Sequence, residues 1–220
     1  MGCDHLTVDT FKGSMQQING HYQSMRVAYT GDLTRAFENM KKAWNTPKGW
    51  ERVQKLATSL GNNLRSCGRS IEQNYTEMDN SGTKWATEQH VWFFNVPPVN
   101  TYTWETFDAG KHDGQLNEVK REEVISAATD IKNALQKIFD GLNNMEKVTK
   151  SDDAFGYYST AGNNPRESLN STLLSKETAM ETAFQGYMTN INSDIDADNA
   201  ARDAALQTEM EDNSTWDLDN

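Results

Sequence analysis

Side chains that could bind a metal or act as a nucleophile are few in this chain and lie far apart. They comprise four histidines and two cysteines, namely His5, His21, His90, His112, Cys3 and Cys67. No histidine stands at helical spacing from another histidine, a cysteine or a carboxylate in a metal-site pattern. Neither cysteine has the surroundings of a catalytic nucleophile, and Cys67 falls in an apolar helical stripe. We therefore expect no catalytic residue, no metal and no cofactor, in a protein that is not an enzyme.

One acidic run begins in the order that calcium loops use. Asp194, Asp196 and Asp198 alternate with other residues and are followed by Asn199. An EF-hand loop that started at Asp194 would need glycine at its sixth position and glutamate at its twelfth. Those positions hold Asn199 and Ala205. The pattern therefore favours a solvated acidic helix end over a calcium site.

The composition restricts the class of protein and its partners. Hydrophobic residues make up 36% of the 220 residues and the mean hydropathy is -0.80, which favours thin helical layers. The net charge is -11, so we expect no binding to nucleic acid or to an anionic membrane surface. No apolar run approaches the length of a membrane span, and the start of the chain lacks the apolar core of a cleavable signal peptide.

Apolar residues recur every three or four positions in four stretches, which is the period of one helical face. These stretches are Phe11 to Trp44, Trp50 to Met78, Val124 to Val148, and Leu169 to Ile195. The third alternates spacings of four and three like a coiled-coil seam. The sequence thus predicts four helices.

Local composition sets where these predicted helices bend, end or continue. Gly31, within Thr30 to Asp32, predicts a kink or local loosening of a first helix that otherwise continues. The second helix is expected to end somewhere between Met78 and His90, with Asn80 to Gly82 as the favoured break. Ala200 to Leu206 is expected to prolong the fourth helix, and the acidic end beyond it to be loose.

An aromatic segment separates the second predicted helix from the third. From Val91 to Gly114 no helical period fits, and six aromatic residues surround Pro97 and Pro98: Trp92, Phe93, Phe94, Tyr102, Trp104 and Phe107. The favoured interpretation is an extended strap or short hairpin that packs its rings on the helices. The alternative is an exposed aromatic surface that docks a partner.

The first two helices are joined by a short turn, Trp44-Asn-Thr-Pro-Lys-Gly-Trp50. Pro47 disfavours helical geometry in Thr46 but suits the first turn of a new helix, so one helix ends and another begins here. Gly49 leaves room where the two backbones come close. Such a short turn predicts two antiparallel helices that cover each other's apolar stripes.

This turn resembles that of the WXG family, the small ESAT-like substrates of type VII secretion, with Trp44 and Gly49 as the residues that carry the likeness. The resemblance covers about residues 11–90. A second family signal, tyrosine followed four positions later by an acid, fits Tyr75 and Asp79. In the family this pair is a secretion signal, so the resemblance implies that Tyr75 and Asp79 share a face that a secretion ATPase reads.

Family members usually form dimers in which two hairpins make a four-helix bundle. The resemblance therefore implies an all-α fold in which two antiparallel hairpins of one chain form that bundle, as a monomeric counterpart of the family dimer. We expect a WXG-like hairpin over 1–90, the aromatic strap over 91–118, a second hairpin over 119–200 and an acidic tail over 201–220.

Two functions are consistent with this arrangement. The first is a non-enzymatic type VII secretion substrate or adaptor, made in the cytoplasm and exported without a cleavable signal peptide. Its partners would be a secretion ATPase or another secreted helical protein. The alternative is a structural assembly protein, such as a virion or surface-layer component, with a helical bundle core.

Overall fold

Helices and extended connections make up the fold. The structure is a computed structural model that describes residues 5–91, 95–151 and 164–216. No strand occurs within these ranges, which confirms the predicted all-α class. Nor does any helix in the described part of the chain have the length and apolar character needed to cross a membrane.

The first predicted helix is one continuous rod with a wider turn inside it. It consists of α1 (His5–Val27), the π-helical segment η1 (Ala28–Leu33) and α2 (Thr34–Ala43). The backbone N–H of Thr34 donates to the carbonyl of Tyr29, five residues earlier, as in a π-helix. The predicted loosening around Gly31 is therefore confirmed as a π turn, a form in which the ladder gains a residue without breaking the rod.

The second helix ends within the predicted range, at Glu88, but not at the favoured break. Helix α3 (Pro47–Glu88) passes through Asn80 to Gly82 without a break, so the predicted end there was wrong. Gly82 is buried, and a Cβ atom on it would lie 2.1 Å from Cε1 of Phe11. The glycine is thus explained by the close contact of two helices rather than by a turn.

The second half of the chain contains α4 (Arg121–Lys150), α5 (Pro165–Thr189) and α6 (Ile191–Trp216). The single fourth helix expected from the sequence was wrong, because Asn190 leaves helical geometry with φ -112° and ψ 15° and separates α5 from α6. The acidic end was expected to be loose, and this too was wrong as far as Trp216, since α6 continues to that residue. Its predicted prolongation through Leu206 is present.

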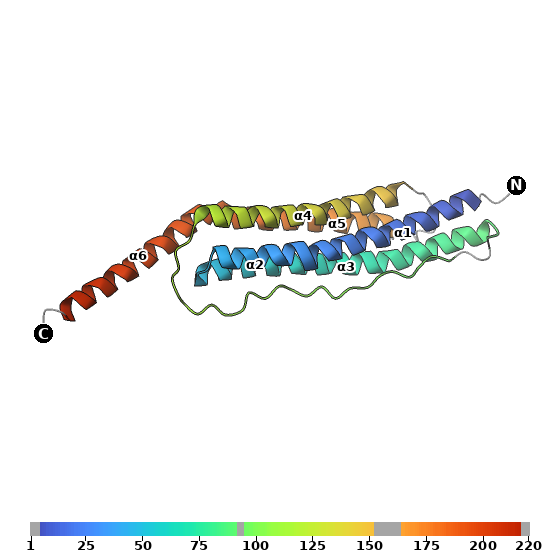
Figure 1. The fold of residues 1–220 in the computed structure, drawn as a ribbon. Helices are drawn as coiled ribbons and strands as arrows, with labels where there is room; N and C mark the ends of the chain where they lie inside the picture. Colours follow the sequence, from blue (N-terminus) through green and yellow to red (C-terminus); the bar gives the residue numbers. More distant parts are fainter. Residues whose placement is uncertain (1–4, 92–94, 152–163, 217–220) are drawn as a thin grey trace.

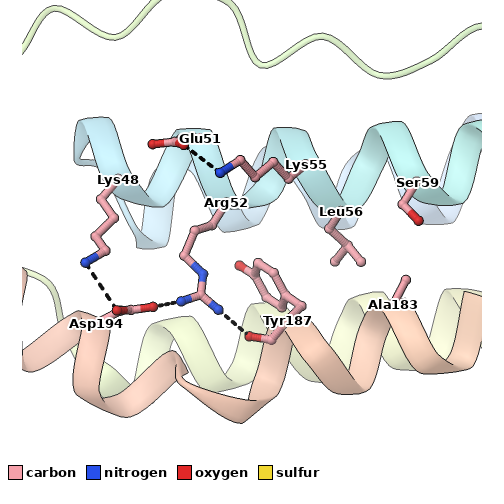
Figure 2. A pocket seen from close by; sticks show the side chains of 9 residues that line it. All are labelled: Lys48, Glu51, Arg52, Lys55, Leu56, Ser59, Ala183, Tyr187 and Asp194. Atoms are coloured by element: carbon pink, nitrogen blue, oxygen red, sulfur yellow. Dashed lines mark hydrogen bonds and ion pairs between the residues drawn. The ribbon is translucent and has the colours of Figure 1, made fainter.

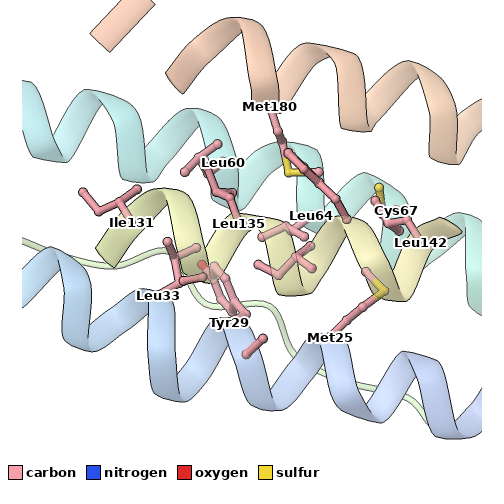
Figure 3. Packing of buried hydrophobic residues seen from close by; sticks show 14 of the residues in the cluster. Met25, Tyr29, Leu33, Leu60, Leu64, Cys67, Ile131, Leu135, Leu142 and Met180 are labelled. Atoms are coloured by element: carbon pink, nitrogen blue, oxygen red, sulfur yellow. The ribbon is translucent and has the colours of Figure 1, made fainter. Parts of the chain in front are cut away.

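The long helices lie side by side, and α6 projects away from them (Figure 1). Helix α3 packs mainly against α5, while α1 and α2 pack mainly against α4. Figure 3 shows side chains from several helices meeting in the core, including Leu33, Leu64, Leu135 and Met180. The core therefore joins the two halves of the chain.

The segment between α3 and α4 is extended and follows the long axis of the helices (Figure 1). Trp104 is 4% exposed, and Tyr102 and Phe107 are half-buried against the core. The prediction of a strap that packs its rings is confirmed for these three residues. Trp92, Phe93 and Phe94 lie outside the described residues, as does most of the loop between α4 and α5.

Polar side chains of α3 bind the strap along its backbone. Gln54 contacts the Phe107 carbonyl (3.0 Å) and the Ala109 amide (2.7 Å), and Arg65 donates to the Trp104 carbonyl (2.9 Å). Further along α3, Glu72 accepts from the Tyr102 amide at 3.0 Å, and the Tyr75 hydroxyl donates to the Pro97 carbonyl at 2.6 Å. The strap thus runs antiparallel to α3. Side chains of α3 form hydrogen bonds with the backbone N–H and C=O groups of the strap, which in a β-sheet would bond to a neighbouring strand.

We predict that Leu135→Ala lowers the free energy of unfolding by roughly 2–5 kcal/mol, because a buried leucine leaves both transfer energy and a cavity behind. Leu135 is 2% exposed. Chemical denaturation measures the change. Leu174→Ala is the matched control, since Leu174 is 60% exposed, and its expected cost is below about 0.5 kcal/mol. Equal costs in the two variants would contradict the assignment of Leu135 to the core.

We predict that truncation after Ala201 leaves the melting temperature nearly unchanged. Every residue from Asp203 to Ser214 is exposed, so its removal uncovers little apolar surface. Differential scanning calorimetry of the truncated and full chains makes the comparison. A large drop in melting temperature would show that this end of α6 stabilises the core.

Candidate functional site at the tryptophan turn

The turn between α2 and α3 is built by local backbone chemistry. Helix α2 ends at Ala43, and Thr46 has an extended backbone (φ -136°, ψ 160°) before Pro47 opens α3. The Thr46 hydroxyl oxygen accepts from the Gly49 amide at 3.0 Å, which makes Thr46 the N-cap of α3. The predicted helix boundary at Thr46 and Pro47 is therefore confirmed.

Trp44 is fully buried and bonded to the far end of the chain. Its indole N–H donates to Oδ2 of Asp198 at 2.7 Å, and the Thr46 hydroxyl donates to the same oxygen at 2.6 Å. Asp198 lies on α6 and is 8% exposed. Both bonds involve a carboxylate in a buried setting, where charge-assisted hydrogen bonds are short and strong. The turn is therefore tied to α6 across most of the sequence.

Gly49 is required by the packing of Trp44. A Cβ atom at position 49 would lie 2.3 Å from the Trp44 carbonyl oxygen and 2.4 Å from Cγ of its ring. Both neighbours are held in place, one as backbone and one as a buried ring, so no side chain fits. The predicted close approach of the backbones at Gly49 is thus present, and the indole fills the space.

Trp50 has a different position from Trp44, although both flank the turn. It is half-buried, and its indole N–H donates to the Lys41 carbonyl at 3.2 Å. The Lys41 ammonium lies 4.4 Å from the centre of the Trp50 ring, and the His112 ring meets its edge at 4.8 Å. Trp50 therefore closes the end of α2 and contacts the strap.

The acidic run at the start of α6 does not converge on one point. Asp194 pairs with Lys48 (3.2 Å) and with Arg52, whereas Asp196 pairs with Arg121. The prediction that this run is simply a solvated helix end was wrong for Asp198, which is buried on Trp44. In the described part of the chain no group of three histidine, cysteine or acidic side chains is placed to hold a metal ion.

Asn199 continues the same pattern toward the strap. Its side-chain amide accepts from the Val119 amide at 2.9 Å and donates to the Val119 carbonyl at 3.0 Å. Val119 lies two residues before the start of α4. The first turns of α6 therefore hold the α2–α3 turn, the N-terminal part of α3 and the entry to α4.

A surface pocket of about 430 Å³ lies beside this junction, between α3 and α5 (Figure 2). The Arg52 guanidinium donates to the Tyr187 carbonyl at 2.7 Å, pairs with Asp194 and stands 5.5 Å from the Trp44 ring centre. Tyr187 is 6% exposed, and burial raises the pKa of its hydroxyl well above the ordinary value. Among the described residues, that hydroxyl has no hydrogen-bond partner.

The Tyr75 and Asp79 pair does not form one exposed surface. Tyr75 is 1% exposed and its hydroxyl bonds to Pro97 of the strap, so its ring belongs to the core. Burial raises the pKa of Tyr75 to about 12. Asp79 is half-buried, and partial burial raises the pKa of its carboxyl. In this conformation only the acid of the pair is within reach of another protein.

The remaining reactive side chains stay apart. Cys67 is fully buried, and burial raises the pKa of its thiol to about 12, so little thiolate forms near neutral pH. His21 lies on α1, and His112 lies on the strap, where it contacts Asn45 at 3.0 Å. His90 follows α3 with a positive φ of 63°. Cys3 lies outside the described residues.

Sequence reasoning placed Thr46 at the helix boundary but missed its role as the N-cap of α3, and it missed the roles of Asp198 and Asn199 in this junction. The threonine had a usable signal, because threonine directly before proline at a helix start is a common N-cap pattern. Asp198 and Asn199 had none, because their partners are distant in sequence. Trp44, Pro47, Gly49 and Trp50 were correctly placed at the turn.

We predict that Asp198→Ala lowers the free energy of unfolding by about 2–3 kcal/mol, because two buried donors, on Trp44 and Thr46, lose a charged acceptor. Denaturant unfolding followed by tryptophan fluorescence measures the change. Asp196→Ala is the control, because Asp196 forms an exposed pair with Arg121 and its loss should cost less than about 1 kcal/mol. If both variants were equally stable, the Trp44–Asp198 bond would not tie the turn to α6.

Comparison of the chain with protein-family models, with curated proteins and with solved structures finds no match in any of the three.

Proposed function

We propose that this protein is a non-enzymatic, WXG-like substrate or adaptor of type VII secretion that acts through protein–protein contacts. The observation that carries the proposal is the turn itself. Trp44 is fully buried, and Gly49 is the one residue type that its ring and carbonyl admit at that position. A tryptophan and a glycine with this physical dependence on each other, at a helical turn, are the feature on which the family resemblance rests.

The proposal includes a tandem arrangement. The rod of α1, η1 and α2 pairs with α3 as one hairpin, and α4 pairs with α5 as the other, so that one chain supplies the four-helix bundle of a family dimer. Two observations support this arrangement: the packing of α3 on α5 and of α1 and α2 on α4, and the core that these helices share. The bond from Trp44 to Asp198 then joins the first hairpin to α6, which follows the second.

Asp79 is the part of the proposed secretion signal that a secretion ATPase could contact. The ring of Tyr75 contributes to the fold instead, because it packs under the strap. The proposed partners remain a secretion ATPase or another secreted helical protein. The proposed location is outside the cell, after synthesis in the cytoplasm.

We predict that Asp79→Asn abolishes export, because it removes the charge and preserves the shape of the side chain. The assay co-expresses the chain with a type VII secretion apparatus and measures it in the cell-free medium. If Asp79→Asn were exported at the level of the unchanged protein, the charge of Asp79 would have no role in secretion. Retention of the unchanged protein inside the cell would overturn the export proposal itself.

Tyr75→Ala requires a stability measurement beside the export assay. Truncation of a buried aromatic ring typically costs about 3–5 kcal/mol, so this variant would lose export by unfolding. Tyr75→Phe is the better comparison, because it keeps the ring and removes only the hydroxyl that bonds to Pro97. Export of Tyr75→Phe together with loss of export by Asp79→Asn would place the signal in the acid alone.

A second function, a structural assembly protein such as a virion or surface-layer component, is favoured by a different observation. Helix α6 leaves the other helices and projects from them (Figure 1), and its residues 203–214 are all exposed. Projecting helices are a common means of contact between subunits. Multi-angle light scattering tests this function, since assembly predicts large homo-oligomers and a self-contained bundle predicts the mass of one chain.

A further inference from the structure

The projecting end of α6, residues 203–214, is here named the acidic arm. It carries four carboxylates, on Asp203, Glu209, Glu211 and Asp212, and no basic residue. Three of them stand near the C-terminal end of the helix, where the helix dipole disfavours negative charge. A helical segment this short is also marginal in water without tertiary contacts. The arm therefore gains helical stability from a partner that supplies positive charge.

The arm also exposes apolar side chains. Leu206 is 44% exposed and Met210 is 73% exposed, and they lie one turn apart on the same side of α6. Among large hydrophobic side chains in the described part of the chain, Met210 has the highest exposed fraction. A partner that covers this face would remove both side chains from water.

The pocket between α3 and α5 has complementary chemistry. Lys48 and Lys55 stand at its edge with side chains 43% and 75% exposed, and Leu56 and Ala183 provide an apolar wall (Figure 2). Three positive side chains line it against two negative ones, in a chain whose net charge is -11. Lys48 pairs with Asp194 and Lys55 with Glu51, so a docking carboxylate would share these lysines with the acids of the pocket. The ring of Tyr187 extends from α5 toward α3 beside Arg52.

We propose that the acidic arm of one copy docks into this pocket of a second copy. The carboxylates of Glu209 and Glu211 would meet Lys48 and Lys55, while Leu206 and Met210 would cover the apolar wall. The arm leads away from the helices of its own chain, so the contact joins one molecule to the next.

Because the arm and the pocket are different surfaces, the contact is heterologous and produces a head-to-tail chain or a closed ring. This inference rests on the assembly function proposed above and is independent of export. Since it depends on opposite charges at an exposed surface, the association weakens as salt is added.

A reciprocal charge exchange tests the contact in the full-length protein. One variant reverses the pocket, Lys48→Glu with Lys55→Glu, and the other reverses the arm, Glu209→Lys with Glu211→Lys. All four side chains lie on the surface, and circular dichroism confirms that each variant remains helical. Sedimentation velocity at low salt then measures association over a range of concentrations.

For the unchanged protein, the average mass of the sedimenting species is expected to rise with concentration. Each variant alone is expected to sediment with the mass of one chain. An equal mixture of the two variants is expected to associate again, because each reversed arm meets a reversed pocket and each original arm an original pocket. A mixture that stays monomeric would overturn the proposal, as would an unchanged protein that never associates. Association that survives truncation after Arg202 would leave the assembly function standing and exclude the arm as its contact.

Discussion

The bond between the Trp44 indole and the Asp198 carboxylate is the contact on which the arrangement of this chain depends. It joins residues 154 positions apart, and the same carboxylate oxygen also holds Thr46, which caps α3. A buried carboxylate is stable only when hydrogen bonds replace the water that it loses. Asp198 therefore fixes where α6 begins its path relative to the turn, and this position brings Asp194 to Arg52 and Asn199 to Val119.

The strap illustrates a geometric constraint of another kind. Its contacts on α3 extend from Gln54 to Tyr75, 21 helical positions, while their partners extend from Ala109 back to Pro97, 12 positions. A helix rises about 1.5 Å per residue and an extended chain about 3.1 Å, so each strap residue passes roughly two residues of the helix. Polar side chains at intervals along α3 can therefore reach successive backbone groups of the strap, and no sheet is required.

The sequence predicted those features of the fold that depend on neighbouring residues better than those that depend on contacts between distant parts of the chain. Local signals were sufficient for the turn at Pro47, for the loosening at Gly31 and for the helices whose apolar spacing was regular, such as α4. They failed at Gly82, because a glycine that admits the Phe11 ring is indistinguishable in sequence from one that ends a helix. For Tyr75 the apolar spacing of the helix predicted a buried side chain, as observed, whereas the bond of its hydroxyl to Pro97 of the strap had no local signal.

The acidic run shows why the candidate site was only half visible. In the sequence alone, alternating aspartates suggest either a site for one bound cation or a solvated helix end. Both interpretations assume that neighbouring aspartates share one environment. In the fold they do not, because Asp194, Asp196 and Asp198 point from a helix start toward Arg52, Arg121 and Trp44 respectively. Beyond that start every residue from Asp203 to Ser214 is exposed, so within a few turns α6 changes from a helix bonded to the rest of the fold to one that faces solvent. The N-terminal part of α6 can thus stabilise the fold of its own chain while the C-terminal part remains exposed for contact with another molecule.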